Sequence, residues 1–265
     1  SRPRTLRAAI DWSYQLLSSE LQRFFAQLSV FRGGCILEAA EAVTGEALAL
    51  DYLMELRECS LLRAEASGAE MRFRMFESLQ QYASERRQEL EGGGVSVQQL
   101  HADYFERWAS EQMSQLRTPA EAAALERFEA DLENVRSAAD WAEREAQPEP
   151  CARICLALGR FLQRRGFQRE ALRRIQSGLD AARRADGSRL YAELLRERAG
   201  LHLDQLEYGE AYQQAREARG LCEALGELGA MADADNLIGL AARGLGQFDE
   251  ARGCLTAALR QFEQA

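Results

Sequence analysis

Three stretches of this chain repeat one another and decide its fold. They read QREALRRI at residues 168–175, YGEAYQQA at 208–215 and FDEARGCL at 248–255, so that a Glu-Ala pair recurs at a spacing of 40 residues. A tiny residue stands twelve positions before each alanine, and another stands seven positions after it. Those residues are Gly159, Ala199 and Gly239 before the alanine, and Gly178, Ala218 and Ala258 after it. Small residues at fixed places let two helices approach closely, which predicts a repeated pair of packed helices.

A turn is expected between the two helices of each repeat. Gly166 marks this turn in the first copy, Tyr208-Gly209 marks it in the second and Gly246 marks it in the third. A helical hairpin of this kind cannot bury its apolar face alone, so neighbouring copies must stack into a solenoid. The last copy ends without a solvating helix, and we expect further repeats after residue 265.

The composition excludes several classes of function. All 33 basic residues are arginine, which removes the lysine of a phosphate-binding loop, of a Schiff base and of a Ser-Lys dyad. The net charge of -9 gives no global attraction to nucleic acid or to anionic lipid. No apolar run approaches the ~20 residues that cross a bilayer and no signal-like segment opens the chain, so a cytoplasmic protein is expected.

The first ninety residues predict several short helices followed by two strands. A helix beginning near Pro3 is followed by one from Ser19, where Ser19 and Gln22 form a capping box. Short helices are expected over residues 37–43 and 48–58. Residues 60–65 and 70–75 then form a hairpin, with apolar residues on one face and polar residues on the other. The apolar set is Met71, Phe73 and Met75, and the polar set is Glu70, Arg72 and Arg74. A helix over residues 76–90 closes the block, and helices followed by a hairpin describe a winged helix.

Two long helices are expected between this block and the repeats. They cover residues 95–116 and 120–146, separated by Pro119. Pro148 and Pro150 mark the joint before the solenoid. The predicted fold class is therefore mainly α, with a winged-helix domain carrying a small β-hairpin over residues 1–91, a helical neck over 92–149 and the repeats over 150–265.

Several short segments of the sequence resemble one protein family. They are residues 4–14 (RTLRAAIDWSY), 28–34 (LSVFRGG), 73–83 (FRMFESLQQYA) and 131–136 (DLENVR). In this order they are similar to the region after the nucleotide-binding domain of bacterial STAND ATPases, the AfsR-like and LuxR-like large transcriptional regulators. The repeats resemble tetratricopeptide (TPR) repeats, best in the third copy, although their period exceeds the usual 34 residues.

The resemblance implies a regulatory and sensory arm in signal transduction. In that family a winged helix packs on an NB-ARC-type ATPase, so ATP or ADP is expected only in an upstream domain and no cofactor is expected in this chain. A Met-His-Asp word at the end of the wing senses the nucleotide there, and Met75-Phe76-Glu77 correspond to it here as a latch. Phe76 replaces the histidine, so Met75 and Phe76 are also read more simply as core residues.

Direct DNA binding and catalysis are both disfavoured. The helix before the wing carries Asp51, Glu55 and Glu58 against Arg57 alone, which repels phosphates. The two histidines lie in different regions and the cysteines lack metal-site spacing, so we expect neither an enzyme nor a metal site. A stand-alone TPR scaffold for protein–protein interaction and a winged-helix DNA-binding protein with a helical dimerisation tail remain as alternatives.

The predicted ligand surface is the inner face of the first helix of each repeat. The residues placed there are Arg160, Gln163, Arg164, Arg196, Asn236 and Arg243. Arginines converging on one groove can hold a protein, an acidic peptide or a small anionic effector, because guanidinium groups bind carboxylates and phosphates bidentately. The alternative is intramolecular pairing with Glu193, Asp204 or Asp233.

Overall fold

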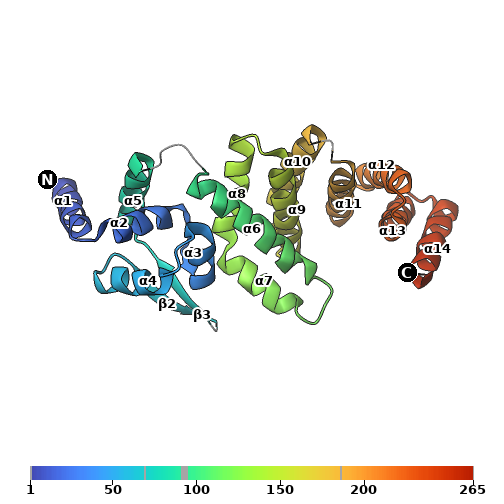
Figure 1. Cartoon of the computed structure of the whole chain (residues 1–265). Helices are drawn as coiled ribbons and strands as arrows, with labels where there is room; N and C mark the ends of the chain where they lie inside the picture. Colours follow the sequence, from blue (N-terminus) through green and yellow to red (C-terminus); the bar gives the residue numbers. More distant parts are fainter. Residues whose placement is uncertain (1, 69, 91–94, 186, 265) are drawn as a thin grey trace. The chain divides into compact units, whose positions relative to one another are not determined.

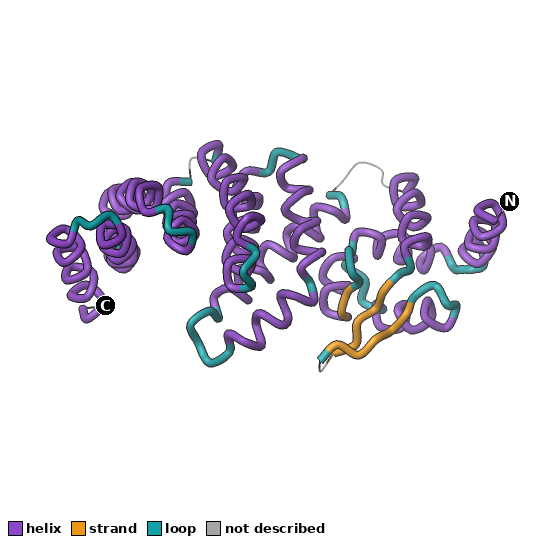
Figure 2. The backbone as a smooth tube through the Cα atoms, turned by 180° about the vertical axis from the view of Figure 1, so that it is seen from behind, coloured by secondary structure: helices purple, strands orange, loops and turns teal. Residues whose placement is uncertain are grey.

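The computed structural model describes residues 2–68, 70–90, 95–185 and 187–264 (Figure 1). It contains two compact units. The N-terminal unit comprises Ser1–Trp108 and Pro119–Trp141, and the repeat unit comprises Ala109–Thr118 and Ala142–Ala265. The residues of the predicted neck are therefore divided between the two units. Helices dominate both, as predicted, and the strands are confined to a small part of the N-terminal unit (Figure 2).

The N-terminal unit begins with short helices around one apolar core. Its first elements are α1 (Arg2–Gln15), α2 (Ser19–Gln27), η1 (Leu28–Val30), α3 (Leu37–Thr44), α4 (Ala49–Glu58) and α5 (Glu77–Leu90). Phe24, Phe25 and Leu53 are among the fully buried side chains of this core. The predicted capping box is wrong by one residue, because Ser18 is the N-cap and accepts a 3.3 Å hydrogen bond from the Leu21 N–H. Gln22 instead donates to the Tyr14 and Leu17 carbonyls.

The predicted hairpin is confirmed and gains a third strand. β1 (Cys35–Ile36), β2 (Arg63–Ser67) and β3 (Glu70–Arg74) form an antiparallel sheet in the order β1-β3-β2. Gly34 precedes β1 with φ at 85°, and a Cβ there would lie 2.3 Å from the Phe73 carbonyl oxygen. Only glycine allows this close approach, which brings the short strand into the sheet.

The predicted alternation along β3 is wrong at two positions. Arg72 was placed on the polar face but is 2% exposed, and Met71 was placed on the apolar face but is 48% exposed. Phe73 is buried as predicted. Arg72 can be buried because its guanidinium forms a bidentate pair with the Asp131 carboxylate, at 3.0 and 2.5 Å. A buried charge is tolerated when it is paired in this way.

The helix predicted over residues 120–146 is also wrong as a single element. The structure has α6 (Val97–Ser114), α7 (Glu121–Ala130) and α8 (Leu132–Arg144), with a break at Asp131. The break lets Asp131 direct its carboxylate to Arg72 in β3. The Trp108 and Phe128 rings pack 5.6 Å apart and fasten α6 to α7. These contacts join α7 and most of α8 to the N-terminal unit.

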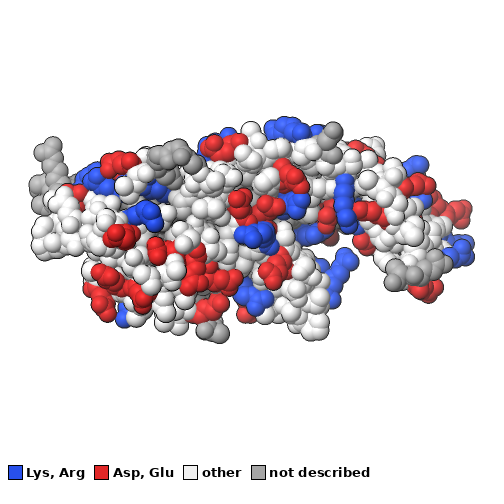
Figure 3. All heavy atoms as spheres, viewed as in Figure 1, with Lys and Arg blue, Asp and Glu red and all other residues white. Residues whose placement is uncertain are grey.

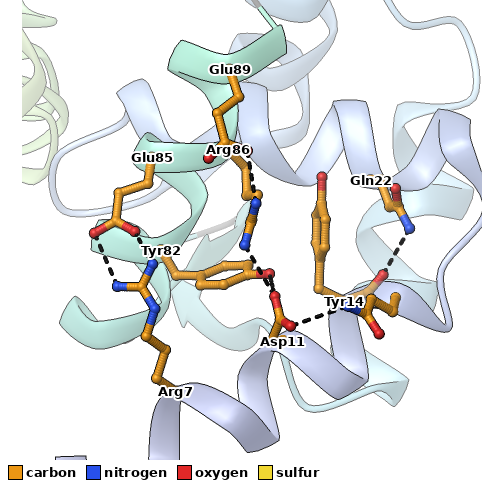
Figure 4. Close-up of polar contacts among 9 residues, drawn as sticks. Arg7, Asp11, Tyr14, Gln22, Tyr82, Glu85, Arg86 and Glu89 are labelled. Carbon is orange, nitrogen blue, oxygen red and sulfur yellow. Dashed lines mark hydrogen bonds and ion pairs between the residues drawn. The ribbon is translucent and has the colours of Figure 1, made fainter. Parts of the chain in front are cut away.

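A cluster of polar and aromatic side chains connects α1 to α5 (Figure 4). The Tyr82 hydroxyl donates to the Asp11 carboxylate at 2.6 Å, and Arg86 donates to the same carboxylate at 3.1 Å. The Arg86 guanidinium also lies over the Tyr82 ring, 4.8 Å from its centroid. Burial, assisted by the Asp11 hydrogen bond, raises the pKa of Tyr82 to about 12, so this hydroxyl remains a donor at neutral pH.

Within the described residues, the repeat unit contains three helical hairpins. They are α9 (Pro148–Arg164) with α10 (Gln168–Arg184), α11 (Ser188–Asp204) with α12 (Tyr208–Leu225), and α13 (Leu228–Gly244) with α14 (Phe248–Gln264). The small residues act as predicted, since a Cβ on Gly159 would lie 2.4 Å from Ile175 and one on Gly239 would lie 2.6 Å from Leu255. First helices also pack on one another, α9 on α11 and α11 on α13.

The turn predicted in the second repeat is displaced by two to three residues. Tyr208 and Gly209 belong to the first turn of α12, and the backbone reverses at Leu206 instead. Leu206 has φ at 62°, which matches Gly166 at 80° and Gly246 at 78° in the other two turns. The 40-residue register therefore holds in space, but a leucine occupies the left-handed position in the second copy.

Candidate functional site

A pocket of about 580 Å³ lies on the first helices of the repeat unit. Its walls come from α9, α11 and α13, and the end of α6 with the following loop contributes on one side. We call it the repeat pocket, and its lining residues are Met113, Leu116, Arg117, Arg160, Gln163, Arg164, Arg196, Glu197, Gly200, Asp204, Asp233, Asn236 and Leu237. This volume lies in the range of pockets that hold drug-sized ligands.

Arg160 is held by two carboxylates of the next hairpin. Its Nε donates to Glu197 Oε1 and its Nη2 donates to Glu193 Oε1, both at 2.7 Å. Burial lowers the pKa of Arg160, but the two carboxylates outweigh burial and the net shift is upward. Arg160 is therefore a permanent cation that fastens α9 to α11, and both of its carboxylate contacts are intramolecular.

The same kind of contact recurs along the row of first helices. Arg196 Nη1 donates to Asp233 Oδ2 at 2.8 Å and joins α11 to α13. Gln163 Nε2 donates to Asp204 Oδ2 at 2.7 Å and joins α9 to α11 a second time. The buried Nε of Arg196 has no hydrogen-bond partner within the described residues. A buried donor without an acceptor loses its hydration without compensation, so this Nε is a cost to the stability of the repeat unit.

The charge lining the pocket is mixed, with an excess of one cation. Four arginines line it, namely Arg117, Arg160, Arg164 and Arg196, together with three carboxylates, Glu197, Asp204 and Asp233. Arg117 and Arg164 are exposed and line the pocket. Asn236 adds an amide that can both donate and accept. The arrangement can bind a polar ligand that carries an anionic group.

Five of the six groove residues named from the sequence line this one pocket. The exception is Arg243, which is exposed near the end of α13 and is not among the lining residues. The intramolecular pairing left open above is present at Arg160, Gln163 and Arg196. The pattern of the repeats gave no signal for Arg117, because it lies in the loop after α6, outside the 40-residue register. Ligand binding by these side chains stays a prediction.

The latch residues Met75, Phe76 and Glu77 lie between β3 and the first turn of α5. Phe76 is 50% exposed, so its interpretation as a core residue is wrong. The Arg63 guanidinium lies 5.3 Å from its ring centroid, which leaves part of the ring in solvent. Met75 is half-buried and lines a small cavity of about 130 Å³ together with Gly34 and Gln80. A connecting segment between strand and helix offers no face to bury, and this explains the exposure of Phe76.

A buried polar network surrounds Asn134 in the N-terminal unit. Asn134 accepts from the Arg32 N–H at 2.7 Å and donates to the Gly34 carbonyl at 2.9 Å and to Asp131 at 2.8 Å. His101 Nε2 lies 3.4 Å from its amide oxygen, and burial lowers the pKa of His101 to about 4. The network connects α6, α8 and the loop before β1, so residues 131–134 fasten the small sheet to the helices that follow it.

Other candidate chemistry is sparse. Among the residues that the structure describes, no group of three or more His, Cys, Asp or Glu side chains is placed to hold a metal ion. Cys151 and Cys155 are buried in α9, as predicted for core thiols. Across the same described ranges, no helix combines the length and the apolar character that crossing a membrane requires.

The chain is similar to proteins that carry the provisional name HTH-type transcriptional regulator. It is 32% identical over 190 residues to such a protein of Mycobacterium bovis and, at the same identity, to one of Mycobacterium tuberculosis. The matched region covers 69% of this chain but only 21% of each relative. No family model matches the chain.

Two solved structures resemble this one. The crystal structure of BtubC (BKLC) from P. vanneervenii superposes with a TM-score of 0.51 and 16% identity, covering 93% of this chain and 92% of that one. This likeness concerns the fold alone. A STAND protein with a tetratricopeptide repeat sensor from Pyrococcus horikoshii gives a TM-score of 0.38 and 13% identity, over 94% of this chain and 51% of that one. That score is too low to support a fold assignment.

Proposed function

We propose that this chain is the regulatory arm of an HTH-type transcriptional regulator and that its repeat pocket binds the effector. The observation that carries the proposal is the convergence of Arg160, Gln163, Arg164, Arg196 and Asn236 on one pocket of suitable size. The similarity to HTH-type regulators supports the regulatory role. Repeats of stacked hairpins also supply extended surfaces for binding, which fits a sensor rather than an enzyme.

The ligand of this pocket carries an anionic group, a carboxylate or a phosphate of an acidic peptide or small effector. Arg160 is held by Glu193 and Glu197, so it positions the helices. Contact with the anion falls to Arg164, whose exposed side chain lines the pocket. Asn236 can orient the same group by a hydrogen bond.

The N-terminal unit takes the part of the winged helix in this proposal. In the full-length protein it packs on an NB-ARC-type ATPase, and the exposed Phe76 and Glu77 take part in that contact. We do not propose that this unit reads DNA. Arg72, one of the arginines of the hairpin, is buried and therefore cannot contact a phosphate. A phosphate-loop domain in the full-length protein supports this assignment, and its absence favours a stand-alone TPR scaffold.

The test adds two anions to the pocket of the full-length regulator. Arg164→Glu with Asn236→Asp leaves the Arg160 and Arg196 ion pairs in place, so we expect circular dichroism to remain unchanged while the response to the inducing signal is lost. Arg243→Glu is the matched control, because it reverses a charge on the same row of helices outside the pocket. A folded double variant that responds like the wild type contradicts the placement of the effector here.

A further inference from the structure

Two adjacent turns of the repeat unit depart from the repeat pattern in the same way. In the second turn Leu206 stands where the other copies have glycine, and its side chain is 68% exposed. In the first turn the aromatic residue comes one place early, at Phe167 instead of at the position of Tyr208 and Phe248, and it is 53% exposed. Both turns carry a large apolar side chain in solvent, as the third turn does at Phe248, which is 65% exposed.

Leu206 also strains the backbone. A left-handed conformation costs a residue with a Cβ roughly 1–2 kcal/mol compared with a right-handed one, and glycine avoids this cost in the two sister turns. An exposed leucine at such a position contributes nothing to the core. Strain of this kind marks a candidate functional contact, and an exposed apolar patch marks a surface that binds protein.

The turns lie along one edge of the repeat unit. Gln163, three residues before Gly166, hydrogen-bonds Asp204, two residues before Leu206. Tyr208, two residues after Leu206, packs against Gly244, where a Cβ would lie 2.3 Å from its ring. The first turn therefore neighbours the second, and the second neighbours the third.

The charges of the first two turns are opposite. Residues 163–170 contain Arg164, Arg165 and Arg169 against Glu170. Residues 203–210 contain Asp204, Glu207 and Glu210 and no arginine. Arg169 and Glu210 are exposed at the starts of α10 and α12. Asp204 already accepts from Gln163 and Glu207 already bonds His202, so the opposite charges offered to a partner are Arg169 in the first turn and Glu210 in the second. Each lies near an exposed apolar residue, Phe167 and Leu206 respectively.

We propose that this edge binds a second copy of the chain, with the first turn of one copy on the second turn of the other. A two-fold axis between the turns makes both contacts identical, so that Phe167 meets the partner's Leu206 and Arg169 meets the partner's Glu210 twice. A surface with adjacent opposite charges is self-complementary under this symmetry. Few residues are involved, so the interface belongs to the small, transient class below about 1,200 Å².

The experiment is sedimentation velocity of the 265-residue chain over a wide concentration range, at low and at high salt. We expect a weak, concentration-dependent dimer that salt weakens further. Leu206→Gly should weaken the dimer by about tenfold or more, because each contact loses its apolar side chain. This variant relieves backbone strain, so its fold is not at risk. Leu245→Gly, which removes an exposed leucine from the third turn, is the control and should leave the dimer unchanged.

Charge reversal tests the pairing itself. Arg169→Glu and Glu210→Arg should each weaken the dimer by at least about tenfold, and the double variant should return to within about threefold of the wild type. A wild type that is monomeric throughout, or a dimer that ignores these changes, overturns the proposal. So does a double variant that fails to recover. None of these results depends on the repeat pocket, so they are independent of the proposed effector site.

Discussion

At the scale of single residues, Leu206 is the clearest conflict between local conformation and residue type. Its φ of 62° belongs to the left-handed region, which two sister turns fill with glycine. Replacing it by glycine should raise the free energy of unfolding of the repeat unit by about 0.5–1 kcal/mol. The relief of backbone strain in the folded state is larger than the free energy that glycine costs by raising the entropy of the unfolded chain. Urea unfolding at low protein concentration measures this without a contribution from self-association.

Leu245→Gly is the comparison for this prediction as well. Leu245 is also exposed, at 44% against 68% for Leu206, but has φ at -83°, which leucine adopts without strain. Glycine there gains nothing from strain relief and adds disorder to the unfolded chain, so stability should fall slightly. Equal effects of the two substitutions would show that side-chain exposure, rather than backbone strain, determines stability at these turns.

A second residue-scale prediction concerns Asp131. It forms the bidentate partner of Arg72, whose side chain is only 3% exposed. Asp131→Ala leaves a buried guanidinium without its carboxylate and should cost about 3–5 kcal/mol of stability in the N-terminal unit. The control is Glu133→Ala. The Glu133 side chain is exposed, so its ion pair with Arg136 contributes at most about 1 kcal/mol. Thermal and urea unfolding of both variants measure these losses of stability. If Asp131→Ala destabilises the protein as little as Glu133→Ala does, the Arg72–Asp131 pair does not have the role given to it.

At the scale of elements, close approach of the paired helices is the property that holds each hairpin. A Cβ at Gly239 would lie 2.6 Å from Leu255 and 3.2 Å from the Ala251 carbonyl oxygen, so α13 and α14 would have to separate. Gly239→Ala should therefore cost about 1–3 kcal/mol. Gly220 lies exposed within α12 with nothing within 4 Å of a Cβ, and Gly220→Ala should stabilise by about 0.5–1 kcal/mol. Urea unfolding measures both changes. If the two substitutions changed the free energy of unfolding in the same direction, the close-contact explanation would be contradicted.

Periodicity in the sequence predicted these elements well where the determining contacts are local or repeated. The helices of all three hairpins and the strands β2 and β3 follow from apolar spacing and turn residues close by in the chain. The break at Asp131 and the burial of Arg72 did not follow, because the two partners are 59 residues apart and each looks like a surface residue alone. The turn at Leu206 was missed for a related reason, since leucine carries no turn signal and only the register of neighbouring copies indicates it.

At the scale of the whole molecule, charge is distributed in patches of both signs. The net charge of -9 arises from 42 acidic and 33 basic residues, and on the face drawn in Figure 3 acidic and basic side chains lie close together. Many of these are paired, as along the first helices of the repeats. Three of the four arginines predicted to converge, Arg160, Arg164 and Arg196, line the repeat pocket, but composition could not show which of them a carboxylate already holds. That assignment depends on distances between hairpins.

Acid is expected to destabilise the chain through the N-terminal unit, where His101 is buried. Burial lowers the pKa of His101 to about 4, and the nearby Arg32 charge lowers it further while the Asn134 hydrogen bond opposes the shift. Between pH 6.5 and about 4 the unfolded chain binds a proton at this histidine and the folded chain does not, so stability falls with falling pH by up to about 3 kcal/mol. Carboxylates titrate in the same window, and His101→Phe separates the two contributions. The slope of unfolding free energy against pH should be shallower in this variant between pH 6.5 and 4 and unchanged above pH 7. An identical slope in both proteins would mean that His101 takes up its proton in the folded state.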